Sequence, residues 1–158
     1  MEAAPTPGFY RNLKMLHKAL LSGIAIFIAI AFYIVYQRKE EWADPSLDRT
    51  LQLVAVIFTV GSLVTGFRLF NKKIIELRHS GLPVRKKLET YRAACIVWWA
   101  MIEGPGLFAT AGYFITGNGA FFALALFHLA ILAVFMPRRE NFKLLLNLSD
   151  IEMDELDH

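Results

Sequence analysis

The chain has 158 residues, about the length of a single domain, and 56% of them are hydrophobic. A soluble domain of this size needs a more charged surface, so the composition favours a membrane protein. The net charge of +3 is small and the basic residues lie at the ends of apolar runs, which argues against nucleic-acid binding. The single cysteine, Cys95, excludes an intrachain disulfide and a cysteine-rich metal site.

Four apolar runs predict four membrane-spanning helices. The shortest runs have about 18 residues, close to the minimum for a bilayer crossing. The expected fold is therefore all-α, a four-transmembrane-helix bundle in which the whole chain, residues 1–158, is one membrane domain. The predicted crossings are about residues 19–36, 50–67, 93–116 and 120–137, followed by a tail at 138–158.

The segments between the runs carry turn and cap signals. Residues 9–18 are amphipathic and predict a lead-in helix lying on the membrane surface. After the turn at Asp44, Ser46 or Asp48 is expected to cap the second crossing. Residues 68–92 remain helical in pattern but basic, which predicts an extended hairpin in which Gly81 is left-handed.

The C-terminal half has its own signals. Pro83 is expected in the first turn after the basic hairpin. Thr116 to Gly119 predict a tight turn between the last two crossings. In the tail, a short amphipathic helix is predicted, whose apolar residues 141–148 dock on the membrane or on the basic hairpin, and a capping box at Ser149 opens a last helical turn. The acidic end is expected either to be solvated or to contact the basic hairpin.

The distribution of lysine and arginine predicts the orientation. Fourteen of the 17 flank the N-terminus, the 68–92 hairpin and the C-terminus, which fall on one side of the four crossings. Both termini are therefore expected in the cytoplasm, with the protein in the inner (plasma) membrane. The bilayer is the expected partner, and residues suited to anionic lipid headgroups or a protein partner are Lys72, Lys73, Arg78, Arg85, Lys86 and Lys87.

An acid near the middle of the third run, Glu103, is the candidate site. A carboxylate at mid-membrane depth is costly, so it indicates function by default. Pro105 cannot donate a backbone hydrogen bond, and with Gly104 beside it the helix is expected to loosen there. His128 lies at a similar depth in the next run, where it can share a proton with Glu103. The candidate intramembrane polar site is Glu103, His128, Gly104, Pro105, Met101 and Thr110.

Three roles for this site stay open. A protonated Glu103 can hydrogen-bond a neighbouring helix and hold the bundle together, it can handle protons or cations, or it can bind a ligand. His128 alone reads more simply as a packing histidine than as a metal ligand. The sequence has no phosphate-binding glycine loop, zinc-protease motif or nucleophile elbow, so no cofactor, metal or catalytic residue is predicted.

Several short motifs carry a resemblance. The segments EGPGLF (Glu103–Phe108) and YFITGN (Tyr113–Asn118), with Pro137-Arg138-Arg139 before an acidic helix, resemble an uncharacterised family of small four-helix bacterial inner-membrane proteins. That resemblance implies a fold and a location but no activity. The outline is also similar to the proteolipid subunits of rotary ATPases, although here the acid lies on the third crossing instead of the last. The membrane-associated glutathione transferases are similar in size, but Arg92 and Glu103 do not fit their motif.

The functional expectation is a non-enzymatic membrane accessory or scaffold protein, either as a homo-oligomer or with a membrane-complex partner. The first alternative is a proton- or cation-coupled transport subunit that uses Glu103 with His128. The second is a small membrane enzyme acting on a lipophilic substrate.

Overall fold

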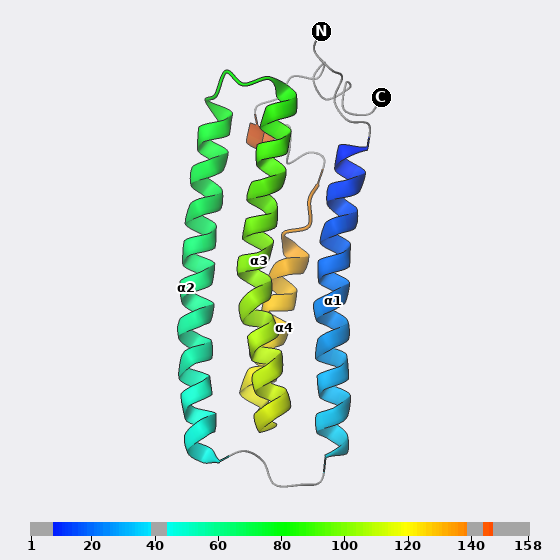
Figure 1. The fold of residues 1–158 in the computed structure, drawn as a ribbon, viewed down its shortest axis with the longest axis vertical. Coiled ribbons are helices and arrows are strands. Elements are labelled where there is room, and N and C mark those ends of the chain that lie inside the picture. The colour runs from blue at the N-terminus through cyan, green and yellow to red at the C-terminus, as the bar shows by residue number, and fades with distance from the viewer. Residues whose placement is uncertain (1–7, 39–43, 139–143, 147–158) are drawn as a thin grey trace.

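The computed structural model of the protein describes residues 8–38, 44–138 and 144–146. Within these ranges the chain is helical apart from its turns and contains no β-strand, so the all-α prediction is confirmed. Four helices follow one another along the chain (Figure 1). They are α1 (Phe9–Gln37), α2 (Pro45–Arg78), α3 (Val84–Thr116) and α4 (Gly119–Val134).

The other helices pack on α3. It contacts α2, α4 and α1, and α1 also contacts α4. In Figure 1, α1 and α2 lie on either side of α3, and α4 lies behind it. The most apolar stretch of α3 is accordingly 44% buried inside the protein, against 22% for those of α1 and α2. The outer helices therefore turn most of their apolar side chains away from the protein.

Length and hydropathy make α1, α2 and α3 able to cross a membrane, whereas α4 is a shorter apolar helix. Its 16 residues span about 24 Å, less than the roughly 30 Å of a bilayer core. The sequence predicted a crossing up to Pro137, but the helix ends at Val134. Pro137 accounts for the early end, because a proline disfavours helical backbone at the residue before it.

The predicted lead-in is not a separate helix on a surface. Residues 9–18 form the first part of α1, which runs without a break to Gln37. Leu13 and His17 are both buried against the rest of the protein. Because this face packs on other helices, the first turns of α1 continue the helix instead of bending away from it.

Asp44, and neither of the two predicted residues, caps the start of α2. Its carboxylate accepts hydrogen bonds from the Ser46 hydroxyl at 2.7 Å and the Ser46 backbone N–H at 3.2 Å. These two bonds, the hydroxyl first, hold the pKa of Asp44 below its usual value. Asp44 takes this role because it immediately precedes Pro45, the first helical residue.

Asp48 instead ties the start of α2 to the α3–α4 turn. Its Oδ2 accepts hydrogen bonds of 2.8 Å from the Gln52 side-chain amide and from that of Asn118. The turn itself has the predicted form. Gly117 is left-handed with φ 68°, and the Asn118 side chain accepts a hydrogen bond from the backbone N–H of Ala120 at 2.9 Å.

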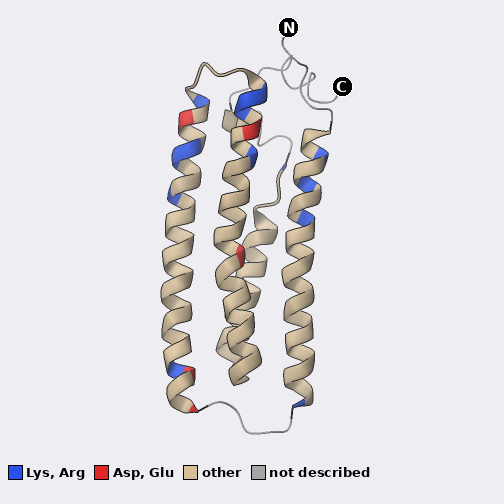
Figure 2. Cartoon of the chain, in the orientation of Figure 1, with Lys and Arg blue, Asp and Glu red and all other residues tan. Residues whose placement is uncertain are grey.

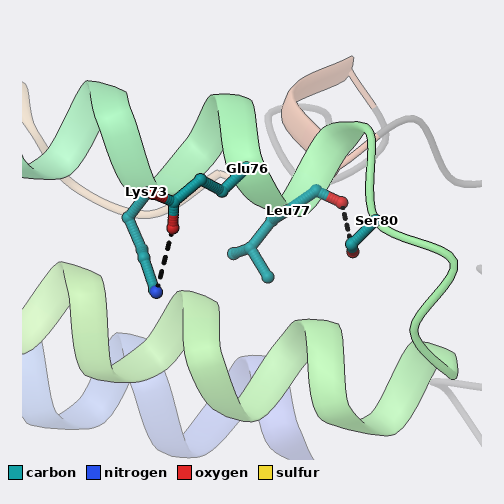
Figure 3. Close-up of polar contacts among 4 residues, drawn as sticks. All are labelled: Lys73, Glu76, Leu77 and Ser80. Atoms are coloured by element: carbon teal, nitrogen blue, oxygen red, sulfur yellow. Dashed lines mark hydrogen bonds and ion pairs between the residues drawn. The ribbon is translucent and has the colours of Figure 1, made fainter.

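The α2–α3 turn closes differently from the prediction, because Gly81 has no positive φ. Side chains satisfy the last carbonyls of α2 in its place. The His79 ring Nδ1 contacts the Ile75 carbonyl at 2.9 Å, and the Ser80 hydroxyl donates to the Leu77 carbonyl at 2.8 Å (Figure 3). Pro83 then stands just before α3 and not inside its first turn.

Charge is distributed along the helices as a membrane protein requires. Figure 2 shows Lys and Arg on α1, α2 and α3 near the end that holds the α2–α3 turn, and further charges where α1 ends and α2 begins; between these ends the helices are uncharged apart from one acid midway along α3. Of the predicted tail, Arg138 and Leu144–Leu146 lie in the described ranges; residues 144–146 are helical, and Leu146 is buried in the main core cluster. The remainder of the amphipathic helix, including Ser149, lies outside the described residues.

Candidate functional site

Gly106 marks the place where α1, α3 and α4 approach most closely. A Cβ atom added there would lie 2.7 Å from Ile24 Cδ1 and 2.9 Å from His128 Cβ, so only glycine fits. Its carbonyl accepts a 2.8 Å hydrogen bond from the buried Thr110 hydroxyl. Pro105, also buried, lies inside a continuous α3. The predicted loosening thus leaves the helix unbroken and coincides with a tight helix contact.

His128 links α4 to α2. The side chain is completely buried, and its Nε2 lies 3.1 Å from the Thr59 hydroxyl. Its Nδ1 makes no hydrogen bond of ordinary geometry within the described residues, although the Ile102 carbonyl of α3 faces the ring. A buried polar contact between helices of this kind stabilises their packing in an apolar surrounding.

Glu103 is half-buried on α3 and forms no hydrogen bond or ion pair with any other described residue. The structure does not join it to His128, whose Nε2 is directed to Thr59 on α2. The next turn of the same face carries Leu107, which is 37% exposed. Glu103 therefore lies at the edge of the exposed surface of α3, open to a group from outside the described chain.

Two other predicted site residues face α2. A Cβ on Gly104 would lie 3.6 Å from Phe58 Cζ, an ordinary contact. The Cβ of Met101 lies within 2.8 Å of the position that a Cβ on Gly66 would take. Gly104 and Met101 therefore belong to the α2–α3 contact, whereas Thr110 and Pro105 are buried on α3 beside Gly106.

The sequence analysis missed His17. This residue is completely buried on α1, and its Nε2 lies 2.9 Å from the carbonyl of Leu132 on α4. Its ring packs edge-on against Trp99, with centroids 4.8 Å apart. Because a carbonyl only accepts, Nε2 must carry the proton, and Nδ1 is left without a partner among the described residues.

A helical spacing could have revealed His17. Leu13, His17 and Ile24 recur at intervals of four and seven, which places them on one face of a helix. Lys14 and Lys18 on either side made the segment look like a membrane-surface helix. The buried stripe was therefore hidden by the charges beside it.

The six predicted headgroup residues are on the surface at the basic end, where Lys87 is half-buried and the others are exposed. Two exposed ion pairs form among their neighbours, Lys73 with Glu76 at 3.1 Å (Figure 3) and Arg85 with Glu89 at 3.2 Å. Exposed pairs of this kind contribute little to stability. These side chains remain available to an anionic ligand.

The site has one carboxylate and two histidines, with no group of three or more metal-ligating side chains among the described residues. Such an arrangement can hold protons and form hydrogen bonds. No protein-family model matches the chain, and no curated protein or solved structure matches it significantly. The resemblance of the Glu103–Phe108 motif thus stays a prediction, and no activity is carried over from it.

Proposed function

We propose that the chain is a non-enzymatic integral membrane protein with four crossings that acts as a scaffold or accessory subunit. Three long apolar helices support multiple crossings. A fourth crossing would use the 16 residues of α4 together with residues 135–137. The basic end of Figure 2 supports placing the termini and the α2–α3 turn in the cytoplasm. The proposed location of the protein is the inner membrane of a bacterium.

The observation that carries the scaffold role is the contrast between Glu103 and the other buried polar groups. Thr59, His128 and His17 are used in contacts between helices of this chain. Glu103 has no such contact within the described residues and lies at the edge of the exposed face of α3. A carboxyl group in an apolar layer is costly without a partner, so a polar group of another membrane helix is the natural complement.

The test compares Glu103→Leu with Glu103→Gln after gentle detergent extraction from native membranes. Native mass spectrometry is expected to show the wild type in an assembly heavier than its 17.9 kDa chain, either with itself or with a partner. The leucine variant should lose the assembly, and the glutamine variant should keep it because an amide still forms hydrogen bonds. Thr65→Leu, on an exposed position of α2, is the matched control. A wild type that is a partner-free monomer rejects the role.

A second candidate function is proton or cation coupling at Glu103, and the two histidines favour it. His17 packs on Trp99 and His128 packs on Gly106, so Glu103 lies at a depth between them on α3. Each histidine has a buried Nδ1 without a partner among the described residues. In this proposal the three titratable groups exchange protons near the same level of α3, although no contact between the described residues joins Glu103 to either histidine.

Proton flux into liposomes decides this second function. The wild type should carry flux that Glu103→Gln abolishes, whereas Glu89→Gln at the basic end should leave it unchanged. Equal flux in wild type and Glu103→Gln, or no flux in either, removes transport and leaves the scaffold role to the assembly measurement.

A further inference from the structure

An open groove with a volume of about 290 Å³ lies between α2 and α3 near the basic end. Its walls are apolar, formed by Leu69 and Phe70 of α2 and by three residues of α3. This volume is at the lower end of about 300–1,000 Å³, the usual range for small-molecule pockets. The α3 residues that line it are Ala93, Ala94 and Val97, and two polar residues, Lys73 and Thr90, complete the lining.

The polar residues lie at one end of this groove. The two helices are antiparallel and joined by the α2–α3 turn, so the lining residues nearest the turn are Lys73 on α2 and Thr90 on α3. Leu69 and Val97 lie at the opposite, deeper end. The groove is therefore amphipathic along its length, with a cation and a hydroxyl at the mouth and hydrocarbon below.

Packing explains why the groove exists. The ring of Phe70 on α2 packs against the rings of Tyr91 and Trp98 on α3, with centroids 6.3 and 6.4 Å away. These bulky side chains keep the two helices apart. The adjacent α3 positions are the alanines 93 and 94, which are too small to fill the space beside these rings. The apolar groove therefore remains open at the outer surface.

The charge at the mouth is strongly positive. Residues 68–92 contain eight Lys and Arg against two Asp and Glu. Lys73 is half-exposed, and its ammonium group is directed to the side on which α3 runs (Figure 3). Lys86 lies one helical turn before Thr90, on the same face of α3. The pairing of Lys73 with Glu76 is exposed and therefore readily exchanged for a phosphate group.

We propose that this groove binds one acyl chain of an anionic phospholipid of the surrounding bilayer. The phosphate group is held at the mouth by Lys73, with Thr90 and Lys86 close by, and the chain lies on Leu69, Phe70 and Val97. The charge at the mouth and the apolar wall below match the two parts of this ligand. The proposal rests on the membrane placement given under the proposed function. It assigns to two of the six predicted headgroup residues, Lys73 and Lys86, a defined lipid-binding site.

The experiment counts lipids on the purified protein by native mass spectrometry in detergent, with added dioleoylphosphatidylglycerol or dioleoylphosphatidylcholine. We expect one phosphatidylglycerol to be retained more tightly than any phosphatidylcholine. Lys73→Gln should weaken it about fivefold, the effect of one basic residue near an anionic surface. Ala93→Leu fills the groove and should abolish retention, and Lys18→Gln, an exposed lysine of α1, is the control expected to bind as wild type.

Three results would overturn the lipid site. They are equal retention of the two lipids, unchanged binding by both groove variants, or loss of a dimer in Ala93→Leu with the lipid count unchanged, which would assign the groove to a second copy. Glycerol 3-phosphate serves as a soluble competitor, and full displacement of lipid by it would place recognition in the headgroup alone. Because Lys73→Gln changes an exposed side chain, it tests the site even if Ala93→Leu unfolds. The assembly measured with Glu103→Leu is independent of these counts, so the two proposals can fail separately.

Discussion

The absence of a Cβ atom at Gly106 allows α1 and α4 to approach α3 closely. An added Cβ would lie under 3.0 Å from Ile24 Cδ1, the end of a completely buried side chain, and from His128 Cβ, which is fixed to the backbone of α4. Two residues earlier, Gly104 meets only Phe58, at 3.6 Å. The two glycines beside Pro105 therefore have different structural roles.

Gly106→Ala is expected to lower the free energy of unfolding by about 1–3 kcal/mol, because an overfilled contact forces neighbouring side chains and backbone apart. Gly104→Ala should be neutral or raise it by up to about 1 kcal/mol, since alanine favours a helix more than glycine does. Reversible unfolding in mixed micelles measures both. Equal loss in the two variants would contradict the assigned contact.

The hydrogen bond between Thr59 and His128 allows a second residue-level prediction. Thr59→Val keeps the shape but removes the hydroxyl, so the stability should fall by about 0.6–1.7 kcal/mol, the range measured for bonds between membrane helices. Thr59→Ser should retain most of the stability. Thr65→Val, at an exposed position of the same helix, is the control and should change little. A destabilised Thr65→Val with an unaffected Thr59→Val would argue against the bond.

At the scale of the element, α4 is the unusual helix because it ends early in an apolar region. The last carbonyls of any helix have no partner within it, and an apolar layer offers no water to replace one. A side chain of α1 supplies one donor, because His17 contacts the Leu132 carbonyl at 2.9 Å. Just beyond the helix, the Tyr10 hydroxyl of α1 donates to the Pro137 carbonyl at 3.3 Å. The first half of α1 therefore caps the end of α4.

Removal of this cap should loosen the last turn of α4. In His17→Leu the backbone amides of residues 131–136 are expected to exchange with deuterium about fivefold faster, which corresponds to the loss of one net hydrogen bond. His79→Leu removes a histidine from an exposed turn and should leave this segment unchanged. Unaltered exchange in His17→Leu would show that the carbonyls have other donors.

At the scale of the whole molecule, most of the basic residues of the described helices lie with the α2–α3 turn at one end, and the end of α1, the start of α2 and the α3–α4 turn lie at the other (Figures 1 and 2). The four crossings proposed above require this arrangement. It also predicts which connections are reachable from each side of the membrane.

Cysteine labelling in intact cells tests that prediction. The single native Cys95 is buried and is replaced by alanine. Gly81→Cys in the α2–α3 turn should react with an impermeant maleimide only after the membrane is opened, and Ser46→Cys at the start of α2 should react before. The reverse pattern would invert the proposed orientation, and labelling of both positions from outside would show that α2, which separates them, does not cross the membrane.

Helices and turns could be predicted from the sequence more fully than the contacts between distant side chains. Long apolar runs and the Gly117–Asn118 turn are encoded by neighbouring residues, so the helical fold and this turn follow from local rules. The bonds of His17 with Leu132 and of His128 with Thr59 join residues far apart in the chain. A single sequence contains no signal for such partners. The position of Glu103 near the middle of an apolar run could likewise be predicted from the residues around it. The direction of its side chain could not, because it depends on how α3 is rotated between its neighbours.

The separation of α1 from α2 has a consequence for assembly in the cell. Of the four helices, α1 is synthesised first, yet its buried face, which includes His17 and Ile24, contacts α3 and α4, the last two of the four to be made. The histidine of α1 therefore has no partner on α4 until that helix has been translated. Of the four helices, the one made first is thus packed last, and insertion factors that shelter a polar group would act on it during that interval.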